Sequence, residues 1–315
     1  MDSSKLGLLS FQIKDTARKI GFDICGIARS RSLEEYGPFL KDWIRKGMND
    51  KMGYLERDIV IRLDPGLLFH GAKSLVVTGL NYYADIAQKD RSAPVLSRYT
   101  YGTDYHNVIT GKLEKLLMWI KSVRPEAEGK PVVDSSPVLE KAWAREAGLG
   151  WQGRHSIVIN RQIGSFFFIG ILILNIELQY DDIFTKDLCG SCRLCIDECP
   201  TGAINNNRTI DARKCIANLT IENRGPIPED IGPFLGRRIY GCDRCQEVCP
   251  WNKKAVPNKN PEFTLSDEIR NMKPDDWKAL TKEQFVRLFG KSPVGRVKYE
   301  QFVRNINLVI SHQEP

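Results

Sequence analysis

The chain has 315 residues, of which 42% are hydrophobic and 27% are charged, a composition typical of a globular protein with room for two packed cores. The formal net charge of +7 suits an anionic partner, usually nucleic acid, although a solvated basic surface is the plainer explanation. The N-terminus shows no export signal, and the longest apolar stretch, residues 166–174, is too short to span a bilayer. We therefore expect a cytoplasmic protein with no membrane partner.

The first 180 residues alternate helical and strand-like patterns. Apolar spacing predicts helices over residues 5–20, 33–45, 106–123 and 137–147, the last with a proline in its first turn. Runs rich in β-branched and aromatic residues predict strands over residues 22–28, 74–80, 131–134, 156–160 and 165–174. The short third strand delivers Asp134 to its C-terminal end, and Gly164 marks a tight turn between the last two strands. This alternation predicts an α/β or α+β domain over residues 1–180.

The composition changes abruptly after residue 180. Eight of the nine cysteines lie within residues 183–255, where Pro and Gly interrupt any regular pattern. Such clustering in a reducing compartment indicates metal or redox chemistry more than disulfides. Short helical pieces then follow at residues 275–280, 282–289 and 298–310. We therefore expect a cysteine-rich domain over residues 181–260 and a C-terminal helical segment over residues 261–315.

Two cysteine motifs in this region share one ending. The first has the spacing C-x2-C-x2-C-x3-C-P of bacterial ferredoxins with two [4Fe–4S] clusters, and it comprises Cys189, Cys192, Cys195 and Cys199. The second comprises Cys242, Cys245 and Cys249, followed by Pro250. It lacks the leading cysteine, because Ile239 stands there, and Cys215 is the remaining thiol that can replace it.

In such ferredoxins the fourth cysteine of each motif ligates the other cluster. The crossing predicts a first cluster held by Cys189, Cys192, Cys195 and Cys249. It predicts a second cluster held by Cys199, Cys215, Cys242 and Cys245. Two structural zinc sites are the alternative, although zinc ribbons do not need two C-x2-C-x3-C-P endings. Cys25, alone on an apolar strand, is expected to be a buried core residue.

The N-terminal domain carries a series of recognisable motifs. They lie at residues 54–57, 96–99, 102–106, 133–137, 150–155 and 164–170, and residues 215–222 add one more beside the cluster motifs. Together these stretches closely resemble the epoxyqueuosine reductases, over about residues 10–305. The resemblance implies a cobalamin-dependent iron–sulfur oxidoreductase that reduces epoxyqueuosine to queuosine at the wobble position of tRNA anticodons, the last step of queuosine biosynthesis.

The resemblance also implies a fold, cofactor contacts and a tRNA surface. The fold would be a cobalamin-binding domain with a nitroreductase-like sheet flanked by helices, related to that of reductive dehalogenases. Asp134 matches the family's proton donor. The expected cobalamin contacts are Arg57, Ser97, Asp134, His155, Val158, Ile169 and Ala217. The expected tRNA contacts are Glu222, Arg224, Arg237 and Arg238. Many family members continue into a C-terminal helical-repeat domain that helps to hold tRNA. This sequence stops at Pro315, where that domain would begin, so we expect either a short-form member or a shortened chain.

The chemistry places further demands on the residues. Converting an epoxide to an alkene takes two electrons and two protons, and a positioned acid accelerates such a step by ~100- to 10,000-fold. Asp134 would serve if burial raised its pKa, whereas a cap of the helix that starts near Pro137 is its structural alternative. The D-x-H-x2-G signature of cobalt-ligating histidine is missing, so we expect no protein histidine on cobalt. His155 is either a cofactor contact or an ordinary hydrogen-bonded histidine.

A tRNA partner would need basic and aromatic side chains. The basic candidates outside the motif match are Arg208, Arg213, Lys214, Arg287, Lys291, Arg296, Lys298 and Arg304. Tyr99, Tyr101 and Tyr240 could stack on a base released from the anticodon, although a structural role is the more common one for a tyrosine. We further expect a monomer that receives electrons from an external low-potential donor.

Two other functions remain open at the level of sequence. A reductive dehalogenase would share cobalamin and two clusters, but it would normally carry an export signal. A ferredoxin-like electron-transfer protein would not need an N-terminal domain of about 180 residues.

Overall fold

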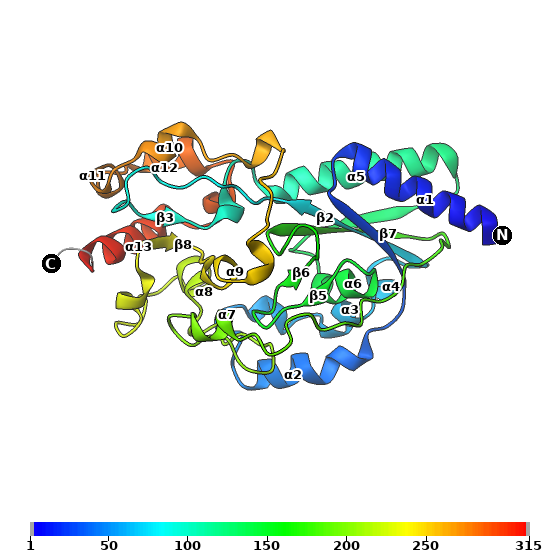
Figure 1. Cartoon of the computed structure of the whole chain (residues 1–315), viewed down its shortest axis with the longest axis horizontal. Coiled ribbons are helices and arrows are strands. Elements are labelled where there is room, and N and C mark those ends of the chain that lie inside the picture. The colour runs from blue at the N-terminus through cyan, green and yellow to red at the C-terminus, as the bar shows by residue number, and fades with distance from the viewer. Residues whose placement is uncertain (1–2, 313–315) are drawn as a thin grey trace.

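A four-stranded sheet forms the centre of the N-terminal half in this computed structural model, which describes residues 3–312 (Figure 1). In spatial order its strands are β1 (Ile24–Arg29), β2 (Ser74–Asn81), β7 (Phe167–Leu174) and β4 (Gly129–Val132). All three pairings are antiparallel, so the architecture is α+β. Every residue of β2 is buried, because helices cover both faces of the sheet.

Helices pack on both faces of this sheet. The helices α1 (Ser3–Ile20) and α5 (Tyr105–Val123) cover one face, where Ile13 and Leu113 are fully buried. The helix α6 (Glu140–Glu146) covers the other face with the buried ring of Trp143. Smaller helices extend this second layer: α2 (Gly37–Arg45), α3 (Ile59–Leu63) and α4 (Pro65–Leu68), with 3-10 turns at Glu34–Tyr36 and Gly53–Leu55.

Several predicted elements differ in detail from the structure. The helix expected over residues 33–45 begins as α2 only at Gly37, because Pro38 favours the first turn of a new helix. The helix α6 begins at Glu140 rather than at Pro137, with Leu139 at its N-cap. The strand expected over residues 156–160 shortens to β6 (Val158–Ile159), which pairs with β5 (Trp151–Gln152). Between β6 and β7, an isolated antiparallel bridge pairs Asn160 with Gly164, and Gly164 makes the turn there.

The C-terminal half is built around a second core. Its parallel pair is β3 (Val95–Leu96) with β8 (Arg238–Tyr240). Its helices are α7 (Leu194–Asp197), α8 (Ile216–Ile221), α9 (Arg244–Glu247), α10 (Asp267–Asn271), α11 (Pro274–Lys278), α12 (Lys282–Phe289) and α13 (Tyr299–Ser311). Short 3-10 turns lie at Arg98–Thr100, Gly232–Leu235, Pro250–Asn252, Pro261–Phe263 and Pro293–Arg296. The three predicted C-terminal helices are confirmed as α11, α12 and α13.

This second core draws on all three predicted domains. It contains Ala93 and Leu96 from the N-terminal region, Leu219 from the cysteine-rich region, and Trp277 and Phe302 from the C-terminal region. Residues 84–101 therefore pack into the second core, although the chain forms strands of the four-stranded sheet both before them (β2) and after them (β4 and β7). The described residues contain no helix that is both long and apolar enough to cross a membrane.

Gly26 provides a test of how tightly α6 packs on the sheet. A Cβ at Gly26 would lie 2.0 Å from the carbonyl oxygen of Ala147, at the end of α6, so Gly26→Ala must push the two apart. We expect a loss of ~1–3 kcal/mol in the free energy of unfolding, as for other overpacked cores. The matched control is Gly111→Ala inside α5, where no atom lies within 4 Å of the added methyl group. This change should stabilise by ~0.5–1 kcal/mol. Equal melting temperatures for the two variants would contradict the packing described.

Candidate active site and cluster-binding thiols

The eight clustered thiols form two neighbourhoods. Burial, together with the nearby thiols of Cys249, Cys189 and Cys192, raises the pKa of Cys195 to about 11. Burial also raises the pKa of Cys245 well above its usual value, and Cys242, Cys215 and Cys199 add to the effect. The two neighbourhoods have the same members as the two ligand sets expected from the sequence. Below, the Cys189 set means the first group, and the Cys245 set means the second.

Short helices hold these thiols in place. Cys195 lies in α7 and Cys245 lies in α9, while Cys215 occupies the N-cap of α8. The indole N–H of Trp151 donates to the sulfur of Cys189 at 3.4 Å. Within the described residues no three His, Cys, Asp or Glu side chains are grouped for a single metal ion. A cubane cluster places four irons between its thiolates, which therefore stand farther apart than the ligands of one ion.

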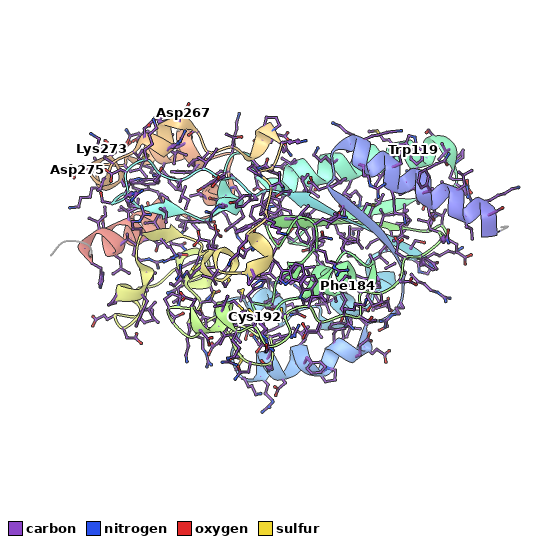
Figure 2. All side chains as sticks on the ribbon, viewed as in Figure 1. Trp119, Phe184, Cys192, Asp267, Lys273 and Asp275 are labelled. Carbon is purple, nitrogen blue, oxygen red and sulfur yellow. The ribbon has the colours of Figure 1, made fainter. Side chains whose placement is uncertain are left out.

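One set has an exposed residue among its thiols. Leu194, between Cys192 and Cys195, is 44% exposed, and Figure 2 shows Cys192 in the lower part of the molecule beside α2. Burial is the first cause of the raised pKa of Cys215, Cys242 and Cys245 in the Cys245 set, and also of Cys195 and Cys249 in the Cys189 set. Because the exposed Leu194 offers an approach from solvent beside Cys192, we call the Cys189 set the outer one and the Cys245 set the inner one.

Asp134 lies in the turn that follows β4. Its φ is 45°, in the left-handed region, which aspartate tolerates better than most residues. Its Oδ2 accepts a hydrogen bond from the Tyr105 hydroxyl at 2.7 Å and lies 3.1 Å from His106 Nε2. Its backbone N–H donates to the carboxylate of Glu140. Asp134 therefore does not cap α6, and its side chain is 45% exposed.

The two partners of Asp134 are positioned by the start of α5. Asp104 is the N-cap and accepts the backbone N–H of His106, while its Oδ1 also lies 2.7 Å from His106 Nδ1. The ring of Tyr105 is stacked between those of His106 and Phe168, each with a centroid distance of 4.2 Å. The hydrogen bonds to Asp104 and Asp134 raise the pKa of His106 to about 9.

The pKa of Asp134 differs from the sequence-based expectation. Desolvation raises it, as expected, but the hydrogen bonds from His106 and Tyr105 outweigh that effect and hold the pKa below its usual value. The condition stated from the sequence, a pKa raised by burial beside the corrin and the substrate, stays a prediction, and the sequence did not indicate these two donors. Glu140 is the carboxyl whose pKa is raised, to about 8, by burial and by the charge of Asp134.

Lys141 links this carboxylate cluster to the thiols. Desolvation lowers the pKa of its ammonium group, although its side chain is exposed. The charges of Glu140 and Asp134 act in the opposite direction and raise this pKa. The thiols of Cys245 and Cys215 raise it as well. Lys141 therefore lies within electrostatic reach of both Asp134 and the Cys245 set. The sequence motifs did not single out Lys141.

His155 is deeply buried near Lys141. Burial and the charge of Lys141 lower its pKa to about 4, so its ring is neutral at physiological pH. Its Nδ1 accepts the backbone N–H of Ile157 at 3.2 Å. Its Nε2 has no hydrogen-bond partner among the residues that the structure describes, so His155 is hydrogen-bonded at one ring nitrogen only. An unpaired buried polar atom of this kind costs ~1–3 kcal/mol.

Residues from the other two regions complete the surroundings of Asp134. Arg296, in the C-terminal region, lies 2.8 Å from Glu222 in the cysteine-rich region. The charge of Arg296 also helps to lower the pKa of Asp134, and it interacts with the hydroxyl of Tyr54. Sequence reasoning placed Arg296 and Glu222 only among tRNA contacts and gave Tyr54, part of the motif at residues 54–57, no role in the site, because their approach depends on tertiary packing.

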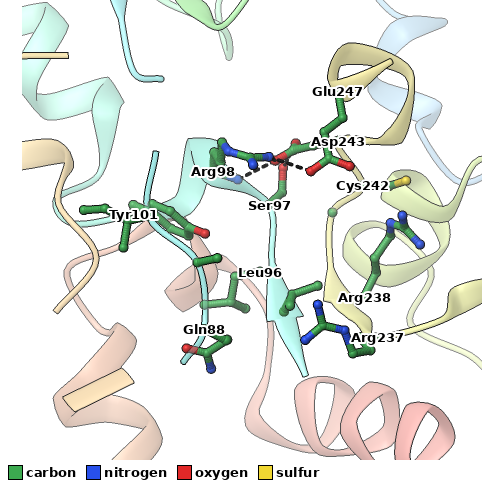
Figure 3. A pocket seen from close by; sticks show the side chains of 14 residues that line it. Gln88, Leu96, Ser97, Arg98, Tyr101, Arg237, Arg238, Cys242, Asp243 and Glu247 are labelled. Carbon is green, nitrogen blue, oxygen red and sulfur yellow. Dashed lines mark hydrogen bonds and ion pairs between the residues drawn. The ribbon is translucent and has the colours of Figure 1, made fainter. Parts of the chain in front are cut away.

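Ser97 lies in the wall of a cavity of about 190 Å³. Its hydroxyl donates to the buried carboxylate of Asp243, which also accepts from Arg98 (Figure 3). Arg237 and Arg238 line the same cavity near Cys242. Among the other expected cofactor contacts, Arg57 is exposed, Val158 is buried, and Ile169 and Ala217 are partly buried.

The candidate tRNA contacts also divide into two kinds. Arg304 donates to the carbonyl oxygens of Leu219, Asn223 and Gly225 and so has a structural role. Arg224, by contrast, is exposed. Tyr101 and Tyr240 are only 7% and 1% exposed, so the alternative of a structural tyrosine is the correct one for both.

Other arginine candidates have acidic partners. Ion pairs join Arg208 to Asp187, Arg213 to Asp211 and Arg287 to Glu268.

Comparison with known proteins agrees with this geometry. Residues 62–135 match the family model described as epoxyqueuosine reductase QueG, DUF1730, and residues 188–252 match a 4Fe-4S double cluster binding domain. The epoxyqueuosine reductase of Leadbetterella byssophila is 45% identical over 95% of this chain and 98% of its own length. That of Cyclobacterium marinum is 43% identical over 94% of this chain and 95% of its own.

Solved structures extend the comparison to the fold. An epoxyqueuosine reductase with a tRNA-Tyr epoxyqueuosine-modified stem loop has a TM-score of 0.90 at 30% identity, covering 97% of this chain and 81% of its own. The Bacillus subtilis enzyme with its catalytic aspartate loop swung out of the active site has a TM-score of 0.89 at 29% identity, covering 97% and 82%.

A reductive dehalogenase shares the fold only, with a TM-score of 0.50 at 16% identity over 99% of this chain and 37% of its own. Identity above 40% over nearly the whole of both chains, a matching family model and the double-cluster thiols all lead to one assignment. The chain belongs to the epoxyqueuosine reductase family.

Proposed function

We propose that this protein reduces epoxyqueuosine to queuosine in the anticodon of tRNA, using two [4Fe–4S] clusters and cobalamin. The observation that carries the proposal is the placement of Asp134. Its carboxylate is held by Tyr105 and His106, while Lys141 lies within electrostatic reach of both Asp134 and the Cys245 set. A group able to handle a proton therefore lies close to groups able to hold an electron carrier.

The chain's own residues fit a corrinoid beside Asp134. The unpaired Nε2 of buried His155 would gain a partner from a polar group of the cofactor, which removes the cost of leaving it unsatisfied. By motif match, Arg57, Ser97, Val158, Ile169 and Ala217 would contact cobalamin together with Asp134 and His155. The hydroxyl of Ser97 is engaged with Asp243, so its contribution rests on the motif match alone. When bound, cobalamin supplies a low-potential cobalt centre that delivers electrons to the epoxide.

The role of Asp134 follows from the stoichiometry of the reaction. Two electrons and two protons convert the epoxide into an alkene and water, and both protons end on the departing oxygen. Negative charge develops on that oxygen as its bonds to carbon break, so a proton donor at this point lowers the barrier. Asp134 is exposed enough to reach a substrate and is oriented through Oδ2 by Tyr105 and His106.

The exposed Leu194 beside Cys192 supports a direction for electron flow. We expect the outer cluster, on Cys189, Cys192, Cys195 and Cys249, to receive electrons from an external low-potential donor. The inner cluster, on Cys199, Cys215, Cys242 and Cys245, would pass them toward the site near Lys141. The match to the double-cluster family over residues 188–252 favours iron–sulfur clusters over zinc.

Contact with tRNA would come from the face near Glu222 and Arg224. One solved relative carries an epoxyqueuosine-modified tRNA stem loop, which supports the same class of partner for this chain. Glu222 pairs with Arg296 beside Asp134, whereas Arg237 and Arg238 lie by the cavity of Ser97.

A dehalogenase is disfavoured, since those proteins share the fold at only 16% identity. The complete N-terminal sheet domain and its site disfavour a simple electron carrier.

Replacing Asp134 tests the proposed proton donor. Asp134→Asn keeps the shape of the side chain but cannot donate an acidic proton, so single-turnover reduction of epoxyqueuosine-containing tRNA should slow by ~100- to 10,000-fold. The matched control, Asp15→Asn on the solvent-facing side of α1, should keep the normal rate. Near-normal turnover in Asp134→Asn, with clusters and cobalamin at full occupancy, would remove this role.

A pair of cysteine variants tests the ligand assignment. Cys215→Ser should lose the inner cluster and reduce bound iron from roughly eight to roughly four atoms per chain. The control is Cys25→Ser, a change of the thiol on β1, which should keep all the iron. Full iron content in Cys215→Ser would show that another group completes the second ligand set.

An exposed arginine tests the tRNA surface. Arg224→Ala should weaken tRNA binding roughly 3- to 10-fold at low salt and reduce the slope of log K against log salt by about one. Lys121→Ala, at the far end of α5, is the control for non-specific charge loss. Equal losses in the two variants would argue against a tRNA surface near Arg224.

A further inference from the structure

His106 is a titratable side chain that the proposed mechanism leaves without a chemical role. Its ring is held at both nitrogens by carboxylates, with Nδ1 2.7 Å from Asp104 and Nε2 3.1 Å from Asp134. A ring that only oriented Asp134 would need a single hydrogen bond. A second carboxylate on the far nitrogen stabilises the doubly protonated, cationic form of the ring.

We propose that His106 supplies protons to Asp134, giving up its Nε2 proton each time Asp134 protonates the substrate oxygen. The inference rests on the proposed function, in which Asp134 faces the epoxide. It extends that function by placing the proton store on a second residue. Because the pKa of Asp134 is held below its usual value, its carboxyl carries no proton of its own at neutral pH.

Other groups around Asp134 fit this role less well. Tyr105 also donates to Oδ2, but burial and the charge of Asp134 raise its pKa, so it keeps its proton and serves to orient the carboxylate. Glu140 accepts the backbone N–H of Asp134 and so contacts its main chain rather than its carboxylate. His106 is the cationic donor in direct contact with Oδ2, and its side chain is 29% exposed, which permits reprotonation from solvent.

The transfer balances over one turnover. As the first carbon–oxygen bond breaks, the Nε2 proton of His106 passes to Asp134, and Asp134 passes a proton on to the oxygen. His106 is left neutral, with its Nδ1 proton shared with Asp104, and then takes a proton from water. A second passage protonates the same oxygen, which leaves as water. The two electrons come from the reduced cofactors of the proposed function, so no further reductant is needed.

The charged and titratable groups facing His106 set its pH dependence. Asp104 faces Nδ1, Asp134 faces Nε2, and the Tyr105 ring stacks on its face, while Glu140 lies farther out and also senses its charge. Each acidic group favours the cation. Asp104→Asn should therefore lower the pKa of His106 by ~1–3 units from its value of about 9.

Nuclear magnetic resonance of labelled histidines tests this without any turnover. The chain has only four histidines, so His106→Gln identifies the signal of interest by its loss, and His312→Gln should leave that signal in place. We expect His106 to titrate near 9 in the cluster-loaded protein and lower in Asp104→Asn. Titration near the ordinary value of about 6.5, unchanged in Asp104→Asn, would overturn the proposal.

The pH profile of single-turnover reduction separates proton supply from mere positioning. The rate in the unchanged protein should stay level up to about pH 9 and then fall. In His106→Gln, which can still donate a hydrogen bond to Asp134, the rate should fall about tenfold per pH unit across the neutral range. Tyr105→Phe is the matched control, since it removes the other hydrogen bond to Oδ2 yet should keep the level region.

Two failures can be told apart. If Asp134→Asn is slow but His106→Gln keeps the level region, the proton store is not His106 and the proposed function stands. If Asp134→Asn reacts normally, the role of Asp134 itself is wrong, whatever the histidine titrations show.

Discussion

A buried polar network joins the cysteine-rich region to the sheet, and the geometry of the candidate site depends on it. The side-chain amide of Asn252, three residues after Cys249, accepts the backbone N–H of Ser165 at 2.7 Å and donates to the Ser165 hydroxyl at 2.9 Å. Gln246, beside Cys245, donates to the Ser165 carbonyl. A Cβ at Gly164 would meet the Asn252 amide oxygen, so the turn before β7 needs a glycine. A satisfied buried network of this kind permits few alternative arrangements.

That network fixes Asp134 and the Cys245 set relative to one another. Phe168, three residues after Ser165 and on β7, stacks on Tyr105, which in turn holds the carboxylate of Asp134. The same network positions α9 with Cys245. Lys141, at the start of α6, lies within electrostatic reach of both Asp134 and the Cys245 set. The site therefore depends on few contacts between elements that are far apart in sequence.

Acidic and basic side chains are concentrated around Asp134. Asp104, Asp134 and Glu140 are gathered near three cations, namely His106, Lys141 and Arg296. The same surroundings lower the pKa of Asp134 and raise that of Glu140, because Asp134 has two hydrogen-bond donors whereas Glu140 is desolvated beside the charge of Asp134. Environments that separate the pKa values of neighbouring acids are typical of sites that transfer protons.

The sequence alone determined what depends on local spacing. The cysteine intervals predicted the thiols that each motif brings together in its own loop, and the ferredoxin pattern predicted the exchange of Cys199 and Cys249 between the two sets. Apolar periodicity predicted α1, α5 and the C-terminal helices. Motif resemblance pointed to Asp134 but not to its protonation state, which depends on Tyr105, His106 and Arg296. Tertiary structure alone decided that state, the approach of Lys141 to the thiols and the shared core that residues 84–101 enter. The physical reason is that a pKa and an interface depend on atoms brought close in space, whereas sequence patterns report only neighbours along the chain.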